Sequence, residues 1–206
     1  MHISKVNEVY LNLKVDSGLG QELADYFTFD VPGAKFMPMY KKRIWDGKIR
    51  LYSQKTGKIY CGLLPYIKKF CSKNSVEYIL EEGIEDDRTL IHEDVRKFTE
   101  SLRPKSKGKK LDIRDYQTNA ILHSLRKHRS LIISPTASGK SLIIYALVRY
   151  YNLLLKDKKI LILVPTTSLV EQMYSDFIDY GWSDKYVHRI YSGHERTTDK
   201  TVVVST

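Results

Sequence analysis

The chain has 206 residues, of which 42% are hydrophobic, enough to build one large or two small buried cores. Its two cysteines, Cys61 and Cys71, are separated by nine residues, a spacing that fits neither a metal knuckle nor a disulfide framework. No apolar run resembles a signal peptide or approaches membrane-spanning length. We therefore expect a soluble cytoplasmic protein of a reducing compartment, with no membrane partner.

The excess positive charge lies in one stretch of the sequence. The whole chain carries 34 basic and 24 acidic side chains, a formal net charge of +10. Residues 35–73 contain eleven of the basic side chains and a single acid, Asp46, so the remainder of the chain is balanced. A basic patch of this density predicts a polyanionic partner.

The first eighty residues predict a small α+β domain. Val9, Leu11, Leu13 and Val15 alternate with other residues, which indicates a half-buried strand. In chain order we expect a strand over 8–15, a helix from Asp16 or Ser17 to about Phe27, a hairpin of strands 48–52 and 58–61, a helix over 63–72 and a strand over 76–80. The order β-α-β-β-α-β is compatible with a split βαβ domain.

A domain boundary is predicted at residues 103–110, because this segment is polar, charged and contains both Pro and Gly. We assign 1–103 to an amino-terminal nucleic-acid-binding domain, with its core at 1–80 and a helical extension at 92–103. Residues 104–110 are then a linker, and 111–206 form the second domain.

From residue 111 onward, helical and strand patterns alternate. We expect helices over about 114–127, 140–155 and 168–180, and strands over 131–133, 160–164, 186–191 and from 202. The strands are continuous apolar runs, so the pattern predicts a parallel sheet covered by helices on both faces, an α/β domain. Because the last strand coincides with the end of the sequence, we expect the chain to be part of a longer protein.

The most specific motif lies between the strand at 131–133 and the helix that begins at Lys140. It reads Ser134-Pro135-Thr136-Ala137-Ser138-Gly139-Lys140-Ser141-Leu142. Such a loop directs backbone N–H groups and a helix N-terminus at phosphate oxygens. Lys140 can reach the β- and γ-phosphates of ATP and the Ser141 hydroxyl can bind Mg²⁺, which makes these two the candidate catalytic residues. Ser134 replaces the usual first Gly, which argues against P-loop kinases and GTPases and favours helicases.

A segment before this loop resembles one found in superfamily 2 helicases. Arg114-Asp115-Tyr116-Gln117 lies 23 residues before Lys140 and is similar to their Arg-x-Tyr-Gln segment. In those enzymes the Gln amide reads the adenine edge, so the resemblance implies that Arg114 and Gln117 bind the nucleotide. The alternative is a helix start with an exposed Gln.

Two segments after the loop resemble helicase segments that contact nucleic acid. Residues 164–172 are similar to motif Ia, which implies backbone contacts from Pro165, Thr166, Thr167, Ser168 and Gln172. Thr167 or Ser168 can also act as the N-cap of the following helix. Tyr191-Ser192-Gly193-His194 resembles the short glycine segment that contacts the same strand, or else forms an ordinary turn.

Cations and aromatic rings are interleaved within the basic stretch. The cations are Lys41, Lys42, Arg43, Lys48 and Arg50, and the rings are Tyr40, Trp45 and Tyr52. The cations can neutralise phosphates, and exposed rings can stack on bases or wedge at a junction. Alternatively, Trp45 and Tyr52 belong to the core and the cations form a solvated face.

Taken together, these motifs and their order resemble the first RecA-like lobe of a superfamily 2 helicase. The stretches Trp45-Asp-Gly-Lys-Ile-Arg-Leu51 and Gly62-Leu-x-x-x-Ile-Lys-Lys-Phe-Cys71 resemble the UvsW-type helicases of T-even-like phages. The resemblance covers essentially the whole chain. It implies a monomeric, ATP- and Mg²⁺-dependent enzyme acting on forks, Holliday junctions, D-loops and R-loops, the last including RNA–DNA hybrid, in recombination, repair and replication.

One missing motif leaves alternatives open. No Asp-Glu-x-His or Asp-Glu-x-Asp follows residue 141, so we expect this chain alone to bind ATP weakly and hydrolyse it poorly. A double-stranded DNA translocase of the restriction or packaging type would share the same lobe. A nucleic-acid-binding module that never hydrolyses ATP would share the basic stretch.

Overall fold

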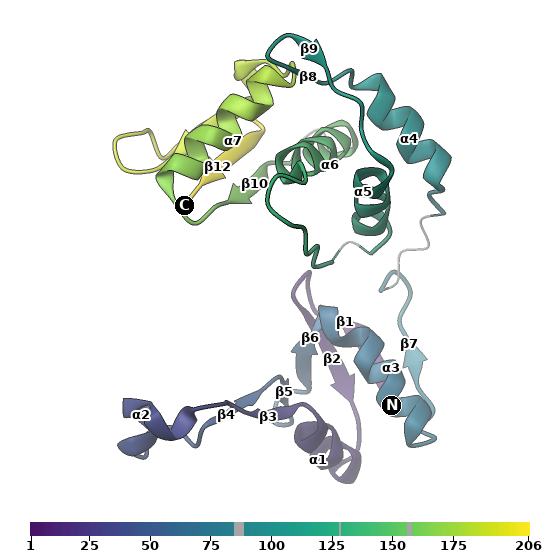
Figure 1. Ribbon diagram of the computed structural model, residues 1–206. Helices are drawn as coiled ribbons and strands as arrows, with labels where there is room; N and C mark the ends of the chain where they lie inside the picture. Colours follow the sequence, from purple (N-terminus) through teal and green to yellow (C-terminus); the bar gives the residue numbers. More distant parts are fainter. Residues whose placement is uncertain (85–88, 128, 156–157) are drawn as a thin grey trace. The chain divides into compact units, whose positions relative to one another are not determined.

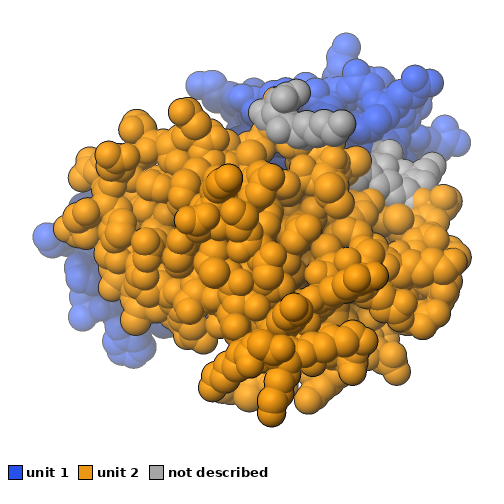
Figure 2. All heavy atoms as spheres, turned by 90° about the horizontal axis from the view of Figure 1, so that it is seen from above, with its two compact units in different colours: residues 1–86 blue, residues 87–206 orange. Residues whose placement is uncertain are grey.

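The computed structural model describes residues 1–84, 89–127, 129–155 and 158–206. The chain divides into two compact units, residues 1–86 and 87–206, which Figure 2 shows in different colours. Among the described residues, no helix is both long and apolar enough to cross a membrane.

The first unit is built on a five-stranded sheet, counted over its described residues, in the order β5-β6-β2-β1-β7 (Figure 1). Its strands are β1 (His2–Lys5), β2 (Tyr10–Lys14), β5 (Tyr52–Ser53), β6 (Lys58–Tyr60) and β7 (Ile79–Leu80). β1 pairs antiparallel with β2 and parallel with β7. Helices α1 (Ser17–Tyr26) and α3 (Leu64–Lys73) pack on it, around fully buried Ile3, Leu11, Leu23, Ile59 and Ile67.

A two-stranded ribbon extends from this sheet in Figure 1. It consists of β3 (Thr28–Asp30) and β4 (Lys48–Arg50), which pair antiparallel, and it ends in the short helices η1 (Ala34–Phe36) and α2 (Pro38–Lys41). Residues 28–50 are named the arm here. Gly47, at φ +79°, accepts a hydrogen bond from the Val31 N–H at 2.8 Å and closes the base of the tip.

The predicted strand over 48–52 is wrong as a single element. Its first half, β4, pairs with β3 in the arm, whereas its second half, β5, pairs with β6 in the sheet. Leu51 marks the change of partner, because its N–H donates to the Phe27 carbonyl at 3.0 Å. β1 was not predicted. Apolar alternation shows that a segment is extended but not which neighbour completes its hydrogen bonds.

The described part of the second unit contains a three-stranded parallel sheet in the order β10-β12-β11. Its strands are β10 (Ile160–Leu163), β11 (Val187–Ile190) and β12 (Val202–Ser205), and its helices are α4 (His92–Ser101), α5 (Asp115–Lys127), α6 (Lys140–Leu154), α7 (Thr167–Asp179) and η3 (Asp184–Tyr186). Fully buried Tyr145, Phe177, Val187 and Val202 join α6 and α7 to the sheet.

The predicted strand over 131–133 is wrong. These residues form no strand, and Leu131 and Ile133 are 84% and 90% exposed. A strand requires a neighbour for its backbone groups, and β10, β11 and β12 pair only with one another among the described strands. The apolar composition of residues 131–133 predicted a buried strand, but a strand is buried in a sheet only when a neighbouring strand pairs with it.

The segments around the sequence-based boundary pack within the second unit. α4, which the sequence assigned to the amino-terminal domain, lies in the second unit and packs against α5. The proposed linker forms a hairpin of β8 (Lys105–Ser106) and β9 (Lys109–Lys110). The Lys107 N–H at its turn donates to both carboxylate oxygens of Asp179 at 3.0 Å, which fixes the hairpin to the end of α7.

Candidate nucleotide and nucleic-acid sites

The candidate phosphate loop, residues 134–142, turns directly into α6. Gly139 is the N-cap of this helix at φ +78°, a conformation that favours glycine. The Lys140 ammonium donates to the carbonyl oxygens of Ser134 at 3.2 Å and Pro135 at 2.7 Å, and the Ser134 and Ser138 hydroxyls share a hydrogen bond. Lys140 thus lies against the carbonyls of its own loop, which a bound phosphate can replace as its partner.

The first turn of α6 presents backbone N–H groups. Within the described residues no side chain caps this helix end, and its first turn contains no acid. The first N–H groups of a helix have no partner inside the helix, and the helix dipole adds partial positive charge there. With Lys140 as its first residue, this end of α6 is suited to bind an anionic oxygen.

Gln117 lies beside the loop with its amide already engaged. Its side chain is 5% exposed. Its carbonyl oxygen accepts from the Arg114 backbone N–H, and its NH₂ group donates to the Ser138 carbonyl, both at 3.0 Å. A Cβ added at Gly139 would lie 2.4 Å from Gln117 Nε2. The structure therefore shows Gln117 fastening α5 to the loop, and its contact with adenine stays a prediction.

A hollow of about 500 Å³ adjoins the loop. It is lined by Arg114, Tyr116, Ala120, Ile132, Ile133, Ser134, Pro135, Thr136, Ala137, Ser138 and Ile143. Tyr116 was not predicted as a site residue, yet its hydroxyl donates to the Ser138 carbonyl at 2.8 Å. Its position between Arg114 and Gln117 in the sequence is the signal that could have identified it.

Ser141, the predicted Mg²⁺ ligand, lies near the hydroxyl of Tyr180, the C-cap residue of α7. Burial, with a further contribution from the Asp176 carboxylate, raises the pKa of Tyr180 to about 12, so the phenol is neutral at physiological pH. The described residues contain no group of three or more His, Cys, Asp or Glu side chains arranged to bind a metal. A single hydroxyl ligand fits Mg²⁺, which proteins bind largely through substrate phosphates and water.

The segment that resembles motif Ia begins α7. Thr166, rather than the predicted Thr167 or Ser168, is the N-cap, and its Oγ1 accepts from the Leu169 N–H at 3.3 Å. Thr166 Oγ1 also lies 3.2 Å from Ser168 Oγ. Pro165, Thr166, Thr167, Ser168 and Gln172 are exposed. The polar side chains and the helix N-terminus of this segment are therefore accessible together.

The Gly193 turn lies at the same edge of the sheet as this segment. β10 and β11 run parallel on either side of β12, so the residues that follow them leave the same edge. Gly193 is exposed at φ +93°, and a Cβ added there would contact nothing within 4 Å. The turn thus exposes backbone near the start of α7.

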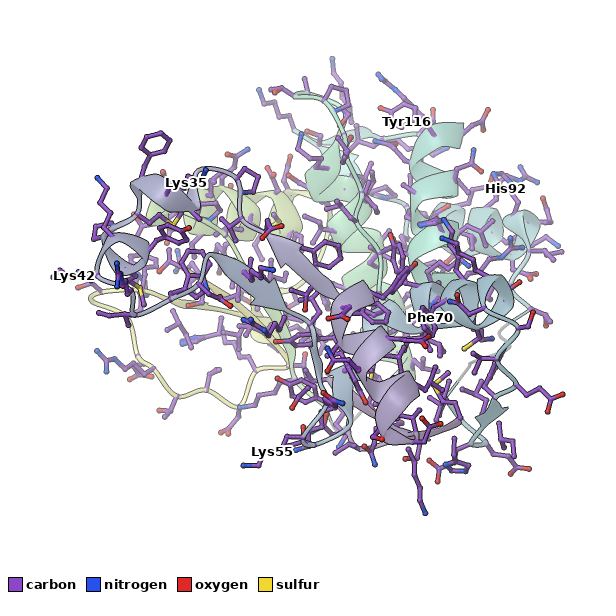
Figure 3. The ribbon with its side chains drawn as sticks, turned by 90° about the horizontal axis from the view of Figure 1, so that it is seen from below. Lys35, Lys42, Lys55, Phe70, His92 and Tyr116 are labelled. Carbon is purple, nitrogen blue, oxygen red and sulfur yellow. The ribbon has the colours of Figure 1, made fainter. Side chains whose placement is uncertain are left out.

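The arm brings together the predicted cations of the first unit. All five, Lys41, Lys42, Arg43, Lys48 and Arg50, are exposed, and Figure 3 labels Lys35 and Lys42 near its end. Arg50 is paired with Asp46, and this hydrogen bond lowers the pKa of the Asp46 carboxyl to about 2. Lys48 lies 4.0 Å from Asp30. Lys41, Lys42 and Arg43, together with exposed Lys35, have no ion pair within the described residues, so these four side chains carry the net charge of the arm.

The aromatic residues of the basic stretch have different environments. Tyr52 is 4% exposed and belongs to the core. Trp45 is half-buried, and its indole N–H donates to the Lys48 carbonyl at 2.8 Å. Phe36 at the tip is 81% exposed and Ile44 is 69% exposed, although neither was predicted as a site residue. The arm therefore combines unpaired cations with exposed apolar side chains.

Comparison with known proteins identifies the class of protein to which the second unit belongs. Residues 110–206 match the sequence family described as type III restriction enzyme, res subunit. With the parallel sheet and the loop before α6, this match identifies the RecA-like lobe of a helicase-type ATPase. Residues 3–81 match the family described as DNA helicase UvsW, N-terminal.

Relatives of known sequence and structure identify the family. The ATP-dependent DNA helicase uvsW of Enterobacteria phage T4 is 33% identical over 207 residues, covering 96% of this chain and 40% of that protein. A crystal structure of the UvsW helicase from bacteriophage T4 superposes with a TM-score of 0.88 at 31% identity, covering 100% of this chain and 74% of that one. A second crystal structure of T4 UvsW gives a TM-score of 0.89, also at 31% identity, covering 99% and 42%.

The chain therefore belongs to the UvsW family of superfamily 2 DNA helicases, and the predicted resemblance is confirmed. The predicted fold class, an α+β unit followed by a RecA-like α/β unit, is also confirmed. The chain spans about two fifths of the length of its curated T4 relative.

Proposed function

We propose that this chain supplies the DNA-recognition domain and the nucleotide-binding part of an ATP-dependent helicase. Its substrates are branched DNAs, namely forks, Holliday junctions, D-loops and R-loops, the last with an RNA–DNA hybrid. It acts as a monomer inside the phage-infected cell, with ATP and Mg²⁺ as cofactors. The single observation that carries this proposal is the start of α6 at Gly139-Lys140-Ser141, which no side chain among the described residues caps, beside the hollow lined by Arg114 and Tyr116.

In this proposal, different residues of the loop bind different parts of the nucleotide. Lys140 exchanges the Ser134 and Pro135 carbonyls for phosphate oxygens, and the N–H groups of the first turn of α6 bind the same phosphates. Ser141 holds Mg²⁺, which when bound neutralises phosphate charge. Arg114 and Tyr116, which line the hollow, contact the base or ribose in this proposal, and Gln117 keeps the loop in place through Ser138.

Two surfaces bind DNA in this proposal. Thr167, Ser168 and the Gly193 turn bind the backbone of one strand at the edge of the parallel sheet. The arm binds the duplex or branch with Lys41, Lys42 and Arg43, and its exposed apolar tip contacts unstacked bases. Support for this division comes from the match of residues 3–81 to the UvsW amino-terminal family.

The test uses the 206-residue chain with Mg²⁺-ATP and with forked DNA, each titrated alone and then together. We expect measurable binding of both ligands and a hydrolysis rate far below that of an intact helicase, because the sequence lacks an Asp-Glu-x-His segment. DNA-stimulated turnover at the level of an intact helicase would contradict this expectation. Failure to bind any DNA at low salt would refute the proposed function.

A further inference from the structure

Three side chains form a closed polar cluster between α7 and β11. The Glu171 carboxylate accepts from the Tyr191 hydroxyl at 2.5 Å through one oxygen, and its other oxygen lies 2.6 Å from the Arg189 guanidinium. The guanidinium also lies 4.1 Å from the centre of the Tyr174 ring. Glu171, Arg189 and Tyr191 are named the α7–β11 cluster. One carboxylate therefore joins a helix to a strand and to the residue that follows it.

The cluster lies between the two segments proposed to bind a single strand. Glu171 is in the second turn of α7, shortly after Ser168, and Tyr191 is two residues before Gly193. The His194 ring packs on the Tyr191 ring at 4.2 Å between centroids, and the His194 N–H donates to the Tyr191 carbonyl at 3.0 Å. A displacement of Tyr191 would therefore displace the Gly193 turn.

The charges of the cluster balance each other. The hydrogen bond from Tyr191, with Arg189 acting in the same direction, keeps the pKa of Glu171 below its usual value, so this carboxylate is ionised at neutral pH. The Glu171 and Arg189 side chains are 42% and 30% exposed. Ion pairs this exposed add little to stability, so a fixed geometry is the more important consequence of the contact.

We propose that Glu171 is a positioning residue for the bound strand. Through the α7–β11 cluster it fixes the Gly193 turn relative to the start of α7, so that both segments bind phosphates of one nucleic-acid strand as a preorganised surface. This inference rests on the proposed function, because it requires both segments to bind nucleic acid.

The sign of the effect on affinity separates this role from plain electrostatics. Glu171 is an acid close to a surface that binds a polyanion. Removal of its charge should tighten DNA binding if the side chain acts only through its charge. Loss of a positioning contact should instead weaken binding, because two loosely related segments bind one strand less well than a preorganised surface does.

The experiment measures the Kd of the full 206-residue chain for a fluorescent single-stranded oligonucleotide at fixed low salt. The variants are Glu171→Gln, Tyr191→Phe and their combination. The control is Glu195→Gln, which neutralises an exposed acid two residues after Gly193. Thermal unfolding of each variant verifies that the second unit is folded. If Glu171→Gln does not fold, the Kd of Tyr191→Phe decides the outcome.

We expect each single variant to bind roughly 3- to 10-fold more weakly, and the double variant no more weakly than the weaker single one, because both disrupt the same α7–β11 cluster. Glu195→Gln should bind as the parent chain does or more tightly. Unchanged or tighter binding by Glu171→Gln, or losses that add in the double variant, would overturn the positioning role. Absence of binding by the parent chain would instead refute the proposed function, and this inference with it.

Discussion

The candidate phosphate loop and the arm offer positive charge in two different ways. In the loop, one cation and a helix end are directed at a small volume, and Lys140 donates to carbonyl groups of the loop itself. In the arm, Lys41, Lys42 and Arg43 are exposed without an ion pair among the described residues, next to exposed Phe36 and Ile44. A preformed loop suits one small anion of fixed shape, whereas the arm suits a polyanion whose geometry varies.

Lys140→Ala is expected to produce the largest difference between the effect on nucleotide affinity and the effect on DNA affinity. This change removes a charged hydrogen-bond donor to phosphate, at a cost of about 2 kcal/mol, or roughly 30-fold in nucleotide affinity. The affinity for forked DNA should stay within about twofold. Titration with a fluorescent ATP analogue and with labelled fork measures both, with Lys185→Ala as an exposed control in the same unit. A parallel collapse of DNA binding would mean that the two regions are not separable.

A smaller effect is expected at the tip of the arm. Phe36→Ala removes an 81% exposed ring, and loss of base stacking should weaken fork binding by about 1 kcal/mol, or roughly fivefold, without changing its salt dependence. Phe29→Ala in β3, where the ring is 52% exposed, is the matched control and should bind normally. Fork affinity and the fluorescence of 2-aminopurine at the branch are the measurements. Equal losses of fork affinity in the two variants would contradict a specific role of the tip in base stacking.

Gly139→Ala tests the close packing of the loop. Alanine at φ +78° is strained by about 1 kcal/mol, and its Cβ would also displace the Gln117 amide, 2.4 Å away, from Ser138. Gly108→Ala is the control, because Gly108 has φ +77° with nothing within 4 Å of the added Cβ. We expect a loss of thermal stability in both variants, larger in Gly139→Ala, and about threefold weaker nucleotide binding only in Gly139→Ala. Equal nucleotide affinities would contradict the role of Gln117.

The smallest effect concerns the ion pair at the base of the arm. The Arg50 hydrogen bond lowers the pKa of Asp46 to about 2. Because the folded pKa is depressed, the contribution of the pair is complete above the usual Asp pKa and is lost as the pH falls through about 2. An NMR titration of the Asp46 carboxyl should show this low midpoint, and Arg50→Gln should raise it towards its usual value. The same midpoint in both proteins would exclude Arg50 as the cause.

Local patterns predicted much of the fold and part of the candidate sites. The spacing of Gly139, Lys140 and Ser141 predicted the start of α6, and apolar periodicity predicted β10 and α7 to within about two residues. Such features depend on residues close in the sequence. The hydroxyl that caps α7 is Thr166 rather than its neighbours, a difference of one position that backbone geometry decides.

Other features depend on partners distant in the sequence. Residues 131–133 have the composition of a buried strand, but a strand forms only beside another strand. The contact between Glu171 and Tyr191 joins residues 20 positions apart and leaves no local pattern. Similarly, the basic stretch indicated where cations gather but not which apolar side chains of the tip are exposed.

The most direct test of the central claim, that the arm recognises branched DNA, compares forked, duplex and single-stranded DNA in salt titrations. The variant changes Lys41, Lys42, Arg43, Lys48 and Arg50 to Gln, and the control changes Lys55, Lys58, Lys69 and Lys73 in the same unit. We predict a fork preference in the parent and control chains that the variant loses, with a salt slope lower by about 3, because three of the five cations have no ion pair in the part of the chain that the structure describes. Equal, weak and steeply salt-dependent binding of all three DNAs by the parent chain would contradict the claim and reduce the arm to a phosphate anchor.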